Sequence, residues 1–128
     1  MEKKKADWLK SIESLYNQIQ KYLAGAIKEG SVKLTYKPKR IAEDYLGDYK
    51  VDEMLLQVGS ERAVFSPKGL NVVGATGRID LQGDLGTVTI IRQSGERWGV
   101  IETRLPALKI VPLNEDSLLA ALKSVMRQ

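Results

Sequence analysis

The chain of 128 residues contains no cysteine and no histidine. Without cysteine there can be no disulfide, no thiolate nucleophile and no cysteine zinc site. Without histidine the chain lacks the side chain that most often moves protons at neutral pH, and also the commonest ligand of transition metals. Ser-His-Asp and Cys-His catalysis therefore cannot be built from this chain alone. We expect no enzymatic activity, no cofactor and no metal.

Long apolar runs are also missing, and no window is apolar for long enough to span a bilayer. The chain begins with lysines, as a secretory signal does, but Asp7, Lys10 and Glu13 interrupt the apolar region that such a signal needs. We therefore expect neither a signal peptide nor a membrane span. The lack of cysteine suits the reducing cytoplasm. The length fits one domain over residues 1–128, with residues 1–6 as a disordered basic tail.

Aromatic residues are few, whereas basic residues are in slight excess, with a net charge of +4. The excess gathers in two clusters, Lys3–Lys5 and Lys33–Arg40. Basic surface attracts nucleic acid and other anionic ligands, but it also serves solubility, which is the interpretation we favour. Tyr36 and Tyr45 flank the second cluster, and no motif of an RNA-binding fold accompanies them.

The densest pattern that is present lies at residues 62–89, where glycine and proline divide short apolar segments. The segments are rich in β-branched residues, which favour strands, while glycine and proline favour tight turns. The stretch therefore predicts an antiparallel meander. No GxxxxGK[ST] motif occurs and no helix is expected after GATGRID, so a phosphate-binding loop is not supported. We assign the glycines at 69, 74, 77, 83 and 86 to turns.

Amphipathic helices are expected at both ends of the chain. At residues 7–29, apolar residues recur every three or four positions, and Gly30 is suited to end the helix. This apolar stripe can pack on the sheet of its own chain, which we favour, or on a partner. The second helix is expected to begin at Asn114, a good N-cap, with Glu115 and Asp116 in its first turn.

The segments between the helices predict strands, apart from one long connection. Residues 31–37 alternate between apolar and polar side chains, and Pro38 is expected to end that strand. Residues 38–52 are expected to form a long connection held by Tyr45 and Tyr49. It contains either a short helical turn at 41–46 or a turn at Gly47-Asp48 after which Tyr49 and Val51 begin a strand. Further strands are expected at 53–58, 62–66, 70–74, 78–83, 87–93, 97–104 and 108–113.

The order of helix, many short strands and helix defines the expected fold class as α+β. It excludes the alternation of strands and helices of a doubly wound parallel sheet. We expect a mostly antiparallel meander of about six to eight strands, forming a strongly twisted sheet or a partial barrel.

Charged residues on the predicted strands are the first candidates for a site. Arg78 and Asp80 share one face of their strand, Glu102 and Arg104 share one face of another, and Arg92 borders the neighbouring turn. If these faces coincide, they form an anion or partner site, because arginine offers paired donors to carboxylate or phosphate. The alternative, which we favour, is cross-strand ion pairs on a solvated face.

Lys37, Lys39 and Arg40 are the second set of candidates. Together the patterns favour a non-enzymatic module that binds or assembles with protein, including a homo-oligomer. The alternative is a module that binds nucleic acid or another anionic ligand through residues 3–5 and 33–40.

Overall fold

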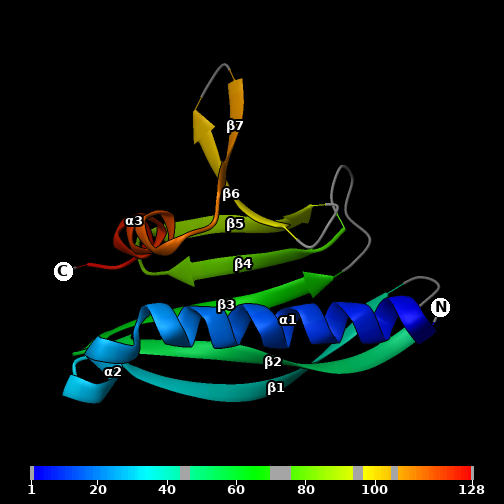
Figure 1. Cartoon of the computed structure of the whole chain (residues 1–128), viewed down its shortest axis with the longest axis horizontal. Coiled ribbons are helices and arrows are strands. Elements are labelled where there is room, and N and C mark those ends of the chain that lie inside the picture. The colour runs from blue at the N-terminus through cyan, green and yellow to red at the C-terminus, as the bar shows by residue number, and fades with distance from the viewer. Residues whose placement is uncertain (1, 44–46, 70–75, 94–96, 105–106, 128) are drawn as a thin grey trace.

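The computed structural model describes residues 2–43, 47–69, 76–93, 97–104 and 107–127. Two helices, α1 (Glu2–Tyr22) and α2 (Ala24–Glu29), precede seven strands, and helix α3 (Glu115–Val125) follows them (Figure 1). The strands are β1 (Lys33–Glu43), β2 (Gly47–Val58), β3 (Glu61–Gly69), β4 (Arg78–Gly83), β5 (Gly86–Gln93), β6 (Arg97–Arg104) and β7 (Ala107–Pro112).

The seven strands form one antiparallel sheet in which each strand pairs with its neighbour in sequence. The expected α+β fold with an antiparallel meander is therefore confirmed. The sheet does not close into a barrel, so β1 and β7 are its two edges.

Both long helices lie on the same face of the sheet (Figure 1). Helix α1 runs along β2 and β3, and α3 lies beside β4 and β5. The Leu85 N–H, between β4 and β5, donates a hydrogen bond of 3.0 Å to the carbonyl oxygen of Val125, the last residue of α3. We call this side the helix face; Met54, Phe65 and Leu81 are paired across it. Because side chains alternate along a strand, Glu53, Ser66 and Asp80 point to the opposite side, which we call the open face.

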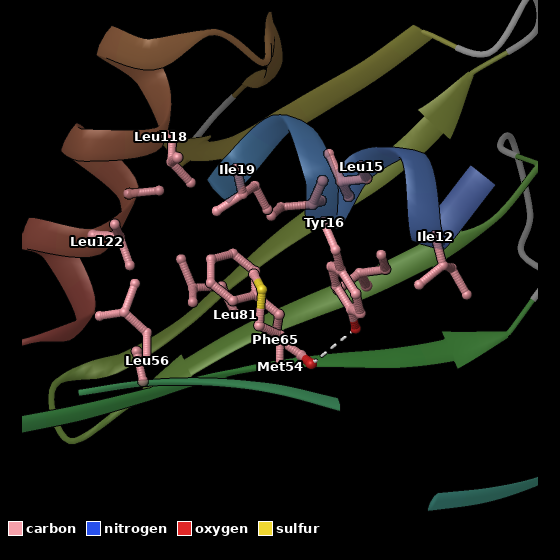
Figure 2. Packing of buried hydrophobic residues seen from close by; sticks show 14 of the residues in the cluster. Ile12, Leu15, Tyr16, Ile19, Met54, Leu56, Phe65, Leu81, Leu118 and Leu122 are labelled. Carbon is pink, nitrogen blue, oxygen red and sulfur yellow. Dashed lines mark hydrogen bonds between the residues drawn. The ribbon is translucent and has the colours of Figure 1, made fainter. Parts of the chain in front are cut away.

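The core fills the space between the helix face and the two helices (Figure 2). Its largest side chains are almost completely buried; they include Trp8, Leu15, Ile19, Phe65, Leu81 and Leu118. Complete burial of such a side chain stabilises the folded state by about 1.5–3 kcal/mol. The apolar stripe of α1 thus packs on its own sheet, as we favoured.

The first helix begins and ends differently from the expectation. Residues 2–6 are helical, so the expected disordered tail is instead the start of α1. The expected single helix is divided at Leu23, and Gly30 ends α2 with φ of 85°, in the left-handed region that suits glycine. Within the described residues, no helix is apolar over a stretch that could cross a membrane.

The long connection expected at residues 38–52 is wrong, because residues 38–43 belong to β1 and residues 47–52 to β2, whereas the alternative, in which Tyr49 and Val51 lie in a strand, is confirmed. Strand β1 continues through Pro38 to Glu43, and β2 begins at Gly47. Proline is tolerated here because β1 is an edge strand, where a missing N–H can face solvent. Tyr49 is buried within β2 and donates a hydrogen bond to Glu43.

Two other expectations, the anchoring role of Tyr45 and the strand at 70–74, concern residues that lie outside the part of the chain that the structure describes. The start of α3 is confirmed. The Asn114 side chain accepts a hydrogen bond of 2.9 Å from the Ser117 N–H, and the Ser117 hydroxyl oxygen accepts one of 2.8 Å from the Asn114 N–H. This reciprocal capping box satisfies backbone donors that a helix start would otherwise leave unpaired.

Candidate binding surface on the open face

The open face carries an excess of positive charge. Cross-strand partners share a face, so the register Lys33–Gln57–Arg62 across β1, β2 and β3 places Lys33 and Arg62 on the same side as Glu53. The cations of this face are Lys33, Lys37, Lys39, Arg62, Lys68, Arg78 and Arg97. Glu53 and Asp80 lie among them. The face therefore combines basic groups from both candidate sets.

Glu53 is already engaged by a polar network at the centre of this face. The Lys39 ammonium donates to the Ser66 hydroxyl at 2.8 Å, and that hydroxyl donates to Glu53 Oε2 at 2.5 Å. The Lys39 and Glu53 charges are 3.9 Å apart. Burial, and next the nearby Lys68 ammonium, lower the pKa of Lys39, against the attraction of Glu53. Lys39 and Glu53 therefore hold each other in place across β1, β2 and β3.

Asp80 is engaged by Arg78, its neighbour on the same face of β4. The Arg78 Nε and Nη2 atoms donate to the two Asp80 carboxylate oxygens at 2.9 and 3.0 Å. This bidentate bond raises the pKa of Arg78. Asp80 is buried, whereas the Arg78 side chain is 43% exposed. The contact is an ion pair within one strand, not the cross-strand pair on a solvated face that we favoured, and the Arg78 guanidinium still reaches the surface.

A hollow of about 210 Å³ lies on the open face near the start of β1. Leu55 and Leu56 contribute to its lining, together with the cations Lys33 and Arg62. Both cations are exposed, and neither forms an ion pair with a described residue. The hollow thus offers an ammonium and a guanidinium to one anionic group. Arg62 was not among the expected site residues; its register with Gln57 was the signal that it joins this face.

Arg92 does not join this surface, which corrects the expected grouping with Arg78. Its neighbour Ile91 pairs with Arg78, so alternation turns Arg92 to the helix face. There it is buried beneath α1, donates to the Ser11 hydroxyl at 2.6 Å, and lies 5.2 Å from the centre of the Trp8 ring. Arg92 therefore connects α1 to β5.

The remaining expected residues are distributed differently. Lys37 is on the open face, whereas Arg40 pairs with Lys50; both are exposed, and the neighbouring Ile41, Tyr49 and Val51 are buried in the core. The backbone of β6 includes Glu102 and Arg104, and their side chains lie outside the described residues. The proposed coincidence of the two charged strand faces stays a prediction.

The helix face has its own groove, between α1 and the edge strand β1. One part, of about 670 Å³, is lined by residues that include Leu9, Ile12, Tyr16, Tyr36, Pro38 and Val51. A second part, of about 400 Å³, shares Tyr36 with the first and extends to Ile27 and Leu34. The first part mixes these apolar groups with polar ones, Glu13, Asn17, Gln20, Lys50 and Asp52, whereas the second part is mainly apolar, with Gln20 and Lys28.

Over the ranges that the structure describes, no three acidic side chains are grouped so that they could hold a metal ion. Comparisons with protein-family models, with curated proteins and with solved structures found no match. The function must therefore be inferred from the chemistry of the surface itself.

Proposed function

We propose that this protein is a non-enzymatic binding module, and that the open face of its sheet binds an acidic protein surface. The observation that carries the proposal is the unequal charge of that face. Its carboxylates Glu53 and Asp80 are engaged by Lys39 and Arg78, whereas Lys33, Lys37 and Arg62 are exposed and form no ion pair with a described residue. Such a surface attracts acidic partners and speeds their association.

Apolar side chains on the same face support a protein partner. Leu55, Val64 and Ile101 are partly buried, and Ile110 is 40% exposed. Protein interfaces combine such apolar contacts at their centre with charged groups around them. The open face therefore offers apolar contact area as well as charge.

Nucleic acid is the second candidate, because the same cations would also attract phosphates. Single-stranded nucleic acid is normally held by bases stacked on exposed aromatic rings. Among the described residues, the exposed large apolar side chains are Tyr36, Leu85, Ile110 and Leu119, and Tyr36 is the aromatic one. Tyr36 pairs with Met54 on the helix face. The open face thus lacks stacking rings among the residues described, which favours protein.

The experiment compares two charge-reversed variants of equal net charge. In the open-face variant, Lys33, Lys37 and Arg62 become glutamate; in the control variant, Lys10, Lys21 and Lys123 become glutamate. Lys10 and Lys21 are exposed on α1, and Lys123 is exposed on α3. The probes are a peptide rich in Asp, Glu and Leu, and a DNA duplex, each labelled with a fluorophore and titrated by polarisation at low and physiological salt. Circular dichroism verifies that both variants fold.

We expect the wild type and the control variant to bind the peptide, and the open-face variant to bind at least about tenfold more weakly. Equal losses in both variants would mean that only net charge matters, which would refute the proposal. If the duplex binds more tightly than the peptide and loses its affinity only in the open-face variant, the nucleic-acid candidate replaces it.

A further inference from the structure

We infer that the free edge of β1 binds an extended segment in which acidic residues alternate with apolar ones, and that this segment pairs with β1 as an additional strand. The inference rests on the proposed function, because it names the kind of acidic partner. It goes further by placing that partner along one strand, where backbone pairing, charge and an apolar groove coincide.

The backbone of β1 provides the first part of the argument. β1 has 11 residues, Lys33–Glu43, and among the described strands it pairs with β2 alone, because it stands at the end of the sheet order. An edge strand presents unpaired N–H and C=O groups that can pair with another strand, and in β1 this row of donors is interrupted at Pro38. Addition of a peptide strand to such an edge is a recurrent mode of recognition.

The side chains of β1 provide the second part, because they differ between the two faces. Lys33, Lys37 and Lys39 point to the open face. Leu34 and Tyr36 point to the helix face and line the groove beside α1. Side chains directly opposite each other on paired strands are about 4.5–5.5 Å apart. An added strand would therefore meet lysines on one side and apolar groups on the other, which selects alternating acidic and apolar residues.

The length of the groove matches such a segment. Leu9 and Ile27 line its two ends on the helix side. At a rise of about 1.5 Å per helical residue, Leu9 and Gln20 lie roughly 17 Å apart along α1, and the second part of the groove continues past the break at Leu23 to Ile27. A strand of about five residues covers the part along α1 at about 3.3 Å per residue, and a segment of about eight residues also reaches the second part. The apolar side chains of the added strand would lie in this groove.

A second copy of this chain is a poor occupant of the same edge. If two β1 strands paired in antiparallel fashion about Pro38, the middle residue of β1, Lys37 of each copy would lie opposite Lys39 of the other, and Lys33 would lie opposite Glu43. Like charges opposite each other destabilise strand pairs, and lysines on an edge strand are a common protection against self-pairing. The facing lysines at the centre thus oppose this self-pairing, whereas an acidic strand would meet Lys37 and Lys39 with opposite charge.

Three peptides of about eight residues test the inference; this length covers an ordinary strand. The first alternates Glu with Val. The second has the same composition with Glu and Val in separate blocks. The third repeats the first with N-methyl groups on alternate residues, on the edge that would pair with β1, so that its charge is kept and its backbone donors are lost. Affinity is measured by calorimetry, and amide hydrogen exchange reports which backbone groups become protected.

We expect the alternating peptide to bind best, the other two to bind at least about tenfold more weakly, and amides of β1 to gain protection with the alternating peptide only. Tyr36→Glu places a negative charge on the apolar side of β1, where it would repel an acidic peptide. It should weaken binding of the alternating peptide more than Lys21→Glu on α1 does. Light scattering should show one copy of the chain per complex.

Three results would overturn strand addition. One is equal affinity for all three peptides without new protection in β1, which would leave the basic open face as the binding surface and so keep the proposed function. Another is dimerisation through β1, with the peptide displaced. The last is the absence of binding to any acidic peptide, which would refute the proposed function as well.

Discussion

The Tyr16 hydroxyl connects α1 to two strands, and its removal should produce a characteristic dependence of stability on pH. The Tyr16 side chain is almost fully buried, and its hydroxyl donates to the Asp52 carbonyl oxygen at 2.7 Å and lies 3.4 Å from the Phe65 carbonyl oxygen (Figure 2). Tyr16→Phe leaves those buried carbonyl groups without this donor. We expect it to lower the free energy of unfolding by about 1–2 kcal/mol at pH 7.

At high pH, the burial of Tyr16 removes the stability advantage of the wild type over Tyr16→Phe. Burial, and next the negative charges of Asp52 and Glu53, raise the pKa of Tyr16 above its ordinary value of 10.0. Because the folded protein keeps a proton that the unfolded chain releases, the stabilisation by Tyr16 is complete below pH 10 and is lost as the pH rises above it. The free energy of unfolding falls by about 1.4 kcal/mol per pH unit above pH 10, so the wild type and Tyr16→Phe should be equally stable at about pH 11.

Urea unfolding between pH 7 and pH 11.5, followed by tryptophan fluorescence, measures both free energies. Tyr36→Phe is the matched control, because the Tyr36 side chain is 43% exposed. We expect this control to stay within about 0.5 kcal/mol of wild type throughout. Curves for wild type and Tyr16→Phe that stay parallel up to pH 11.5 would refute the account of a buried, hydrogen-bonded phenol.

Three further changes have defined expected outcomes. Gly77→Ala should destabilise by about 1–3 kcal/mol in chemical denaturation, because the added methyl group would overlap the Trp8 ring. Asn114→Ala should cost about 1 kcal/mol of stability, since it removes the side-chain acceptor at the start of α3, and thermal unfolding would measure this. Lys68→Gln should raise the pKa of Lys39 towards its ordinary value, as followed by NMR of the Lys39 ammonium, because it removes a nearby like charge.

Each of these changes has a close control. Gly25→Ala adds the same methyl group where nothing lies within 4 Å, so it should not destabilise. Asn114→Asp keeps an acceptor and should stay close to wild type. Lys68→Arg keeps the positive charge, so the pKa of Lys39 should stay lowered; a shift equal to that of Lys68→Gln would contradict the electrostatic explanation.

Local patterns were sufficient to predict most of the fold. The alternation of residues 31–37, the glycine-bounded segments 78–83 and 87–93, and the cap at Asn114 each depend on neighbours in sequence, and each predicted the correct type of element. Pro38 was misleading, because its effect depends on whether a strand lies at an edge. Edge position is a property of the whole sheet and cannot be read from one segment.

The candidate surface was only partly predictable, for a related reason. The pairing of Arg78 with Asp80 follows from a spacing of two residues within one strand. The separation of Arg92 from Arg78 depends instead on the register between β4 and β5, and the contribution of Arg62 depends on the register between β2 and β3. A one-residue change of register would exchange the faces, so charge on a sheet cannot be summed before strand pairing is known.

The contact between Ser11 and Arg92 has a consequence for how the chain folds. The two residues are 81 positions apart, whereas every strand pairs with its neighbour in sequence. Neighbouring strands close short loops and can form early, but the contact of α1 with β5 must close a long loop. During synthesis α1 leaves the ribosome before β5. Its apolar stripe is therefore exposed in the nascent chain until β2 and β3 follow, and its end at Trp8 and Ser11 stays uncovered until β5 is made.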